Sequence, residues 1–136
     1  MIEFHLDGVS GVSAYMQVVH QVKQALRLGM LRPGDQLPTV REVVATLAIN
    51  PNTVLKAYRE LELDGLIAGK QGQGTFVLKS LAGPALASHA ELRAELVEWL
   101  HRAWTAGMDD DSIAALMVTT LREQVTARTK REEGAA

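Results

Sequence analysis

The sequence contains no cysteine, and this absence excludes structural disulfides and thiolate metal sites. Such a composition is typical of a protein that works in a reducing cytoplasm. No apolar run approaches the roughly 20 residues of a membrane span, and the first residues, MIEFHLDG, lack the basic start and apolar core of a signal peptide. We therefore expect a cytoplasmic protein with no membrane partner.

A strong charge of either sign is also lacking, because the formal net charge of the 136 residues is only -2. Residues 1–79 carry a net charge of +1, and residues 80–136 carry -3. This weak asymmetry neither requires nor excludes a nucleic-acid partner, because local clustering of cations decides such binding. The length suits one small domain with a helical appendage, and 47% apolar residues are ordinary for a globular chain.

Catalytic signatures are missing as well, since the sequence has no Ser-His-Asp order and no zinc-ligand spacing. Residues 69–74 superficially resemble a phosphate-binding GxGxxG loop, but their glycines are spaced three and then two apart, and no helix follows. His89 and His101 would lie about 120° apart around a helix, which argues against a shared metal ion. The run Asp109–Asp111 fits a helix N-terminus better than a cation site. We expect no enzyme activity, no metal site and no cofactor.

Apolar periodicity predicts a strand and then a helix at the start of the chain. Ile2, Phe4 and Leu6 alternate with polar residues, as in a short strand. From Ser13 onward, apolar residues recur at spacings of three and four, and Gly29 lies where such a helix would end.

Two further helices have clear start signals. Thr39 can cap its own helix while Glu42 reaches back in a capping box. Asn50 is a good N-cap, and Pro51 suits the first helical position because its missing N–H costs nothing there. Short strands at 66–68 and 75–78, joined by the glycine-rich loop 69–74, complete the order of a winged helix-turn-helix.

The exposed side of the third helix is the candidate DNA-reading face. Asn52 could pair with adenine, Thr53 could meet a thymine methyl group or a phosphate, and Lys56 could neutralise a phosphate. Arg41, near the start of the second helix, could reach a phosphate or a base edge. The alternatives are a merely solvated helix face and, for Arg41, an ion pair with a neighbouring acid such as Glu60 or Glu42.

The stretch that contains these helices and the wing resembles a known family. PGDQLPTVREVVATLAINPNTVLKAYRELELDGLI followed by GQGTFV is similar to the DNA-binding domain of GntR-family transcription regulators over about residues 11–78. The form NPNTVLKAYRELE, with a short extension of about two helices, looks like the YtrA-like branch of that family. The resemblance implies that Arg41 contacts DNA and that Gln71, Gly72 and Gln73 form a wing tip that enters the minor groove. Leu55 departs from the pattern, because many relatives have arginine there. The candidate DNA-contacting residues are Thr39, Arg41, Asn50, Asn52, Thr53, Leu55, Lys56, Arg59, Lys70, Gln71, Gly72, Gln73 and Gly74.

Two amphipathic helices are predicted after the wing, one from 85 to 106 and one after Gly107. Their apolar stripes are too wide for a single intramolecular contact, so the surplus area is expected to be buried against a second subunit. The candidate dimer-interface residues are Leu92, Leu96, Trp99, Leu100, Ala103, Trp104, Leu116, Met117 and Leu121.

The predicted fold is mainly α with a small β-wing. It comprises a winged helix-turn-helix at 1–79, a hinge at 80–84, a helical dimerisation region at 85–128 and a disordered tail at 129–136. The predicted function is sequence-specific regulation of transcription, most simply repression by a homodimer on an inverted-repeat operator in double-stranded DNA. The alternative is a winged-helix protein-interaction module without operator binding. An unknown small-molecule effector, if one is sensed, would bind between subunits or at the hinge.

Overall fold

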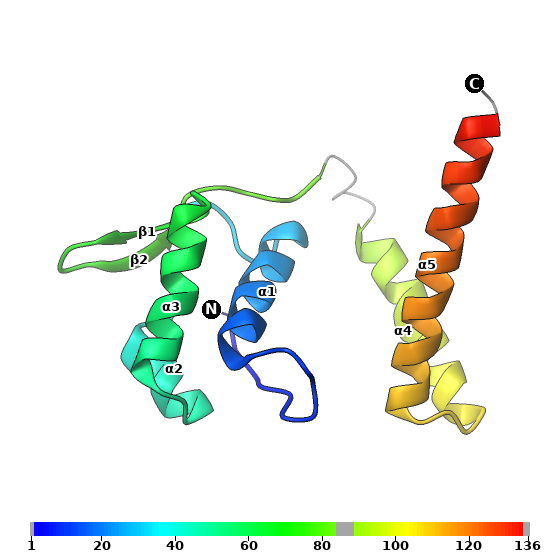
Figure 1. The fold of residues 1–136 in the computed structure, drawn as a ribbon, viewed down its shortest axis with the longest axis horizontal. Coiled ribbons are helices and arrows are strands. Elements are labelled where there is room, and N and C mark those ends of the chain that lie inside the picture. Colours follow the sequence, from blue (N-terminus) through cyan, green and yellow to red (C-terminus); the bar gives the residue numbers. More distant parts are fainter. Residues whose placement is uncertain (1, 84–88, 135–136) are drawn as a thin grey trace. The chain divides into compact units, whose positions relative to one another are not determined.

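The computed structural model describes residues 2–83 and 89–134 of the chain. The chain divides into two compact units, Met1–Ala87 and Ser88–Ala136. Figure 1 shows the helices and strands of each unit.

The described residues of the first unit form three helices and a two-stranded antiparallel sheet, which confirms the mainly α fold with a small wing. The helices are α1 (Ala14–Arg27), α2 (Val40–Leu47) and α3 (Pro51–Leu63). The strands are β1 (Ile67–Lys70) and β2 (Gly74–Val77), which project as a hairpin beyond α3 (Figure 1).

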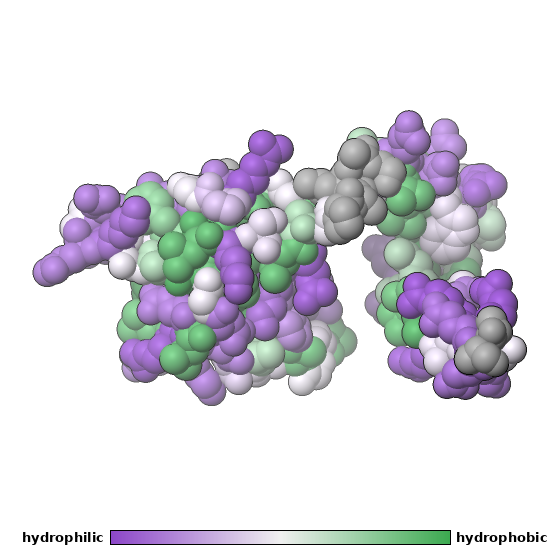
Figure 2. Space-filling model, turned by 90° about the horizontal axis from the view of Figure 1, so that it is seen from above, coloured by the Kyte–Doolittle hydropathy of each residue, from purple (hydrophilic) through white to green (hydrophobic). Residues whose placement is uncertain are grey.

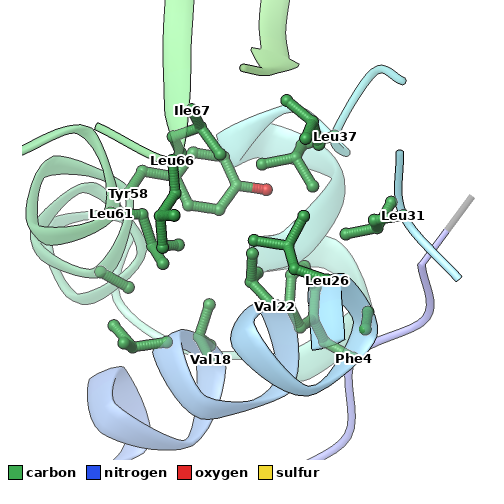
Figure 3. Packing of buried hydrophobic residues seen from close by; sticks show 14 of the residues in the cluster. Phe4, Val18, Val22, Leu26, Leu31, Leu37, Tyr58, Leu61, Leu66 and Ile67 are labelled. Atoms are coloured by element: carbon green, nitrogen blue, oxygen red, sulfur yellow. The ribbon is translucent and has the colours of Figure 1, made fainter. Parts of the chain in front are cut away.

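The core of this unit lies between the three helices and the base of the hairpin. Figure 3 shows Val18, Val22 and Leu26 of α1 facing Leu61 of α3, with Ile67 of β1 above them. These side chains have at most 1% of their surface exposed. Burial of such a stripe is the main stabilising term for short helices, because isolated helices of this length are marginal in water.

The predicted N-caps of α2 and α3 are confirmed by their hydrogen bonds, whereas no bond from the Thr39 N–H to the Glu42 carboxylate completes the predicted capping box in the described residues. The Thr39 hydroxyl oxygen accepts a hydrogen bond from the Glu42 backbone N–H at 3.1 Å. The Asn50 side-chain oxygen accepts one from the Asn52 backbone N–H at 2.8 Å, and Pro51 occupies the first turn of α3. Both caps satisfy backbone donors that the helix itself leaves unpaired.

The predicted strand at Ile2–Leu6 is wrong, although Phe4 is buried as the alternation required. In the described part of the chain no strand lies beside this segment. Instead, the Gln21 side chain accepts from the His5 N–H at 3.1 Å and donates to the His5 carbonyl at 2.7 Å. A glutamine amide therefore supplies the hydrogen bonds that a partner strand would have supplied.

The wing is tighter than predicted, because its strands extend further toward the tip. Lys70 pairs with Gly74, so that only residues 71–73 form the connecting turn. The turn closes through a hydrogen bond from the Gln73 N–H to the Lys70 carbonyl at 2.9 Å. Gly72 has φ +75°, a conformation that favours glycine.

The predicted hinge at 80–84 overlaps the first unit. Leu81 packs against the core of that unit, and the Leu78 N–H donates to the Leu66 carbonyl at 2.8 Å. Pro84 lies outside the described residues.

The described residues of the second unit form α4 (His89–Thr105) and α5 (Asp110–Gly134). The predicted helix start at 85 lies outside the described residues. Gly107 separates the helices with φ +92°, and Asp109 accepts from the Ser112 N–H at 2.7 Å, as expected of a helix cap. Residues 129–134 are helical, whereas a disordered tail was predicted there; the Thr129 hydroxyl donates to the Val125 carbonyl at 3.0 Å within this helix. None of the helices in the described residues combines the length and apolarity needed to cross a membrane.

Candidate nucleic-acid interface

Helix α3 separates its side chains into a buried stripe and an exposed polar side. Val54, Ala57, Tyr58 and Leu61 are buried, each with at most 4% of its surface exposed. The predicted DNA-contacting residues of this helix lie on the other side. Asn52, Leu55, Lys56 and Arg59 are exposed, and Thr53 is half-buried.

Leu55 has 42% of its surface exposed, which is unusual for a leucine in the middle of an amphipathic helix. Its position next to Lys56 places an apolar side chain on the polar side of α3. An apolar side chain there can contact a thymine methyl group but cannot pair with a guanine as arginine does. Base preferences of relatives that have arginine at this position therefore do not transfer to this chain.

Arg41 is exposed in the first turn of α2. Within the described residues no ion pair joins Arg41 to Glu42 or Glu60. Its guanidinium is available to an external anion.

Lys56 is held by an aromatic ring of another helix. Its Nζ lies 3.9 Å from the centroid of the Tyr15 ring at the start of α1. A lysine over a tyrosine face gains about 0.5–1 kcal/mol at an exposed site. This contact limits the orientations of the ammonium group before any ligand binds.

The wing and the start of α2 share one shallow concave surface of about 530 Å³. Its lining brings predicted residues from two elements together. They are Thr39, Lys70, Gln71, Gly72, Gln73 and Gly74, and Gly69 and Thr75 complete the lining. The projecting end of the wing is covered by hydrophilic side chains (Figure 2). Lys70 Nζ lies 5.0 Å from the centroid of the Phe76 ring, so this cation too lies over an aromatic face.

Tyr58 fixes α3 against the segment that leads into α2. The Tyr58 side chain lies among the core residues (Figure 3). Its buried hydroxyl donates to the Pro38 carbonyl at 2.6 Å. Burial raises the pKa of the Tyr58 hydroxyl well above its ordinary value, and the nearby Glu42 carboxylate raises it further. The hydroxyl therefore stays protonated and can always donate this bond.

Two residues that contact the predicted DNA-contacting residues, Tyr15 and Gln36, were not predicted from the sequence. Tyr15 lies at the start of α1, and its contact with Lys56 of α3 has no signal in the sequence. Gln36, between α1 and α2, donates to the Gln73 carbonyl of the wing at 3.2 Å. Gln36 precedes Leu37 and Pro38 in a segment too short to show strand alternation.

The second unit exposes an apolar groove of about 560 Å³ between α4 and α5. Leu96 and Trp99 of α4 line it together with residues 116–118, 120 and 121 of α5. Leu92 and Leu121 have 61% and 67% of their surfaces exposed, so most of the predicted interface is open on this chain.

Four predicted interface residues are buried, half-buried or hydrogen-bonded within the unit, and Trp99 is one of the half-buried ones. Ala103 is buried, with 8% of its surface exposed, and therefore has little area left for a partner. Trp104 donates from its indole N–H to the Asp110 carboxylate at 2.7 Å and so connects the end of α4 to the start of α5. Leu100 is half-buried.

The exposed groups near α3 and the wing are amides, hydroxyls and cations, which suit hydrogen bonding and phosphate neutralisation. Two short helices joined by a tight turn and followed by a β-hairpin define the winged helix-turn-helix class. The family of bacterial regulatory proteins named gntR matches residues 14–77. This chain belongs to the GntR family of bacterial regulatory proteins.

The relatives and solved structures are transcription regulators. Over 72 residues the chain is 43% identical to the HTH-type transcriptional repressor YtrA of Bacillus subtilis, a match covering 53% of this chain and 55% of that protein. It is 38% identical over 88 residues to the uncharacterized HTH-type transcriptional regulator YhcF of the same organism, covering 65% of each. The chain therefore spans little more than half to about two thirds of these curated relatives.

Two solved structures resemble the chain over most of their length. YtrA from Sulfolobus acidocaldarius, a GntR-family transcription factor, is 30% identical with a TM-score of 0.52, covering 72% of this chain and 97% of that one. A transcriptional antiterminator from Listeria monocytogenes is 30% identical with a TM-score of 0.54, covering 88% of this chain and 90% of that one. These relatives and solved structures are named for roles in the control of transcription.

Proposed function

We propose that this chain represses transcription in the cytoplasm by binding an inverted-repeat operator in double-stranded DNA as a homodimer. One observation supports this most strongly. The first turns of α3 carry Asn52, Leu55 and Lys56 exposed on a helix whose opposite stripe is buried in the core. An exposed polar helix start on a rigid support is what reading of base edges in the major groove requires.

In this proposal α3 is the recognition helix. Asn52 pairs with the N6 and N7 edge of an adenine, and Leu55 contacts a thymine methyl group. Thr53 and Asn50 contribute near the helix start, while Arg41, Lys56 and Arg59 neutralise phosphates. The Tyr15 ring keeps the Lys56 ammonium close to the surface of α3, which lowers the entropy lost when it meets a phosphate.

The wing supplies a second contact, in the minor groove. Gln71, Gly72 and Gln73 form the turn at its tip, and Gly74 and Lys70 flank that turn. Glycine allows backbone to approach the groove closely, and glutamine can donate to the acceptors on adenine and thymine. Thr39 lines the same concave surface from the start of α2.

The groove between α4 and α5 is where a second copy would dock. Leu92, Leu96, Leu116 and Leu121 each leave more than two fifths of their surface exposed, and Met117 leaves 37%. An exposed stripe of this extent on a helical pair is typical of an interface between subunits. A symmetric dimer would place two α3 helices on successive major grooves, so that an inverted repeat is read twice.

Repression is supported by the name of the B. subtilis relative, which is a transcriptional repressor. A dimer bound over a promoter would block polymerase. A small-molecule effector, if one is sensed, would bind between subunits or at the hinge 80–84 and would there change the spacing of the two winged units.

The salt dependence of duplex binding tests this function against the alternative of a protein-contact module. Phosphate neutralisation releases counterions, so the logarithm of the affinity should fall linearly with the logarithm of the salt concentration. Fluorescence anisotropy with labelled duplex at several salt concentrations measures this slope. A folded dimer that binds no duplex at low salt would refute DNA binding and leave the protein-contact module.

A further inference from the structure

Residues 35–37 pair with the base of the two-stranded wing through one isolated β-bridge and flanking backbone hydrogen bonds. Gln36 forms an isolated antiparallel bridge with Phe76 of β2. The Leu37 N–H donates to the Thr75 carbonyl at 2.9 Å, and the Val77 N–H donates to the Asp35 carbonyl at 2.8 Å. The segment between α1 and α2 therefore supports the base of the hairpin.

This backbone support ends at Leu37. Pro38, the next residue, has no N–H to donate, and the chain turns there into the cap of α2. Beyond Thr75, the tip of the wing has no further backbone partner from this segment among the described residues. A two-stranded hairpin end without other support is only marginally ordered in water.

The Gln36 side chain extends the support toward the tip. Its Nε2 donates to the Gln73 carbonyl at 3.2 Å, which lies in the turn itself. Gly74 makes room for this amide, because a Cβ built at Gly74 would lie 2.6 Å from the Gln36 Nε2. Gly74 also has φ +124°, a conformation that side chains rarely adopt. The absence of a side chain at Gly74 thus leaves space for the Gln36 amide.

We propose that Gln36 is a positioning residue that holds the tip of the wing at the angle needed to enter the DNA groove. Gln36 acts through the backbone of Gln73 and does not itself read DNA. The inference rests on the proposed function, because it assigns to the wing a contact with DNA.

The first test uses the protein without DNA. In Gln36→Met the side chain keeps its length but loses the donor, so hydrogen exchange of the backbone amides at 70–75 should become about three- to tenfold faster. Exchange in α1 and α3 should stay unchanged. Gln24→Met is the matched control, because Gln24 is exposed on α1 and its side chain makes no recorded hydrogen bond in the described residues. Unchanged exchange at the wing of Gln36→Met would refute the positioning role.

The second test measures affinity for a duplex selected by the wild-type chain. Gln36→Met should weaken binding about three- to tenfold, without changing the salt slope, because glutamine is neutral. In a background carrying both Gln71→Ala and Gln73→Ala, the same change should have little further effect, since the tip side chains that it positions are gone. Equal losses in both backgrounds would show that Gln36 contacts DNA directly and would overturn the proposal.

The two tests distinguish failure of the proposed DNA-binding function from failure of the positioning role of Gln36. A wild-type chain that selects and binds no duplex refutes the proposed function, and the DNA role of Gln36 falls with it. Faster wing exchange in Gln36→Met would still establish what Gln36 does to the hairpin.

Discussion

At the scale of single residues, the polar groups of the winged unit are held by neighbours from other elements. Tyr15 lies under Lys56, and Phe76 lies under Lys70. Tyr58 connects α3 to Pro38 through a buried hydroxyl. The pairs Lys56–Tyr15 and Tyr58–Pro38 join residues distant in sequence, and each pair limits the orientation of a group close to the proposed DNA surface.

Tyr58→Phe should lower the free energy of unfolding by about 1–3 kcal/mol, because the buried Pro38 carbonyl loses its donor. The ring stays in place, so core packing is preserved. Urea unfolding followed by circular dichroism measures the change. Tyr15→Phe is the matched control, because its hydroxyl makes no recorded hydrogen bond in the described residues; an equal loss in both variants would contradict the assigned role of Tyr58.

Asn52→Ala should lower affinity for the operator by about 1–3 kcal/mol while leaving binding to random duplex nearly unchanged. Loss of a bidentate contact to a base edge produces this difference between cognate and random duplex.

Lys56→Ala should weaken both kinds of binding and lower the salt slope by about 1. Anisotropy titrations on cognate and random duplexes measure these effects, with Glu62→Ala, an exposed change further along α3, as the control. Equal losses on both duplexes for Asn52→Ala would remove it as a base reader.

At the scale of elements, the sequence predicted those parts whose signals are local. Thr39, Asn50 and Pro51 predicted the starts of α2 and α3 because caps and proline act within one turn. Periodicity predicted the buried stripe of α3. The glycine-rich loop between two short apolar segments predicted the wing, and the resemblance to a family then indicated the role of the residues at its tip.

The parts that escaped prediction depend on contacts distant in sequence. Ile2–Leu6 alternates like a strand, yet the Gln21 side chain serves as its partner, and no periodicity reveals that. Gln36 supports the wing from 37 residues away. The helix at 129–134 was missed because polar composition suggested fraying, although the four charged residues 130–133 are good helix formers. Ala103 was assigned to a partner because the stripe of α4 could not show which part is buried within the chain.

The cap of α5 gives a prediction about pH. Hydrogen bonds from the side chain and backbone N–H of Ser112 hold the pKa of Asp109 below its ordinary value. Because the pKa of Asp109 is lower in the folded state, its ionised carboxylate stabilises the fold at pH values above the unfolded pKa of about 3.9. This stabilisation is lost as the pH falls through the folded-state pKa. The helix content of the wild-type chain, followed by circular dichroism in acid, should therefore decrease over that range more than in Asp109→Asn. Asp111→Asn removes the same charge without removing the cap. If both variants reduced the acid-induced loss of helix content equally, the assignment of Asp109 as the stabilising cap would be contradicted.

At the scale of the whole molecule, the proposed mechanism requires two copies. Leu121→Asp should weaken the dimer by more than tenfold, because a carboxylate without a partner would have to be buried in the interface. Leu121 is 67% exposed on the single chain, so the change should leave the fold of each unit intact.

Sedimentation equilibrium measures this effect, and operator affinity should fall with dimerisation. Thr119→Asp is the matched control, since it adds the same charge about 200° around α5. A Leu121→Asp chain that remains dimeric would show that the interface lies elsewhere.

The most direct test of operator binding is selection of bound sequences from a random duplex pool at about 0.15 M salt, where binding by phosphate contacts alone is weak. Enrichment of an inverted repeat with half-sites about one helical turn apart is the expected result. A folded, dimeric chain that enriches no sequence would contradict sequence-specific regulation by this protein.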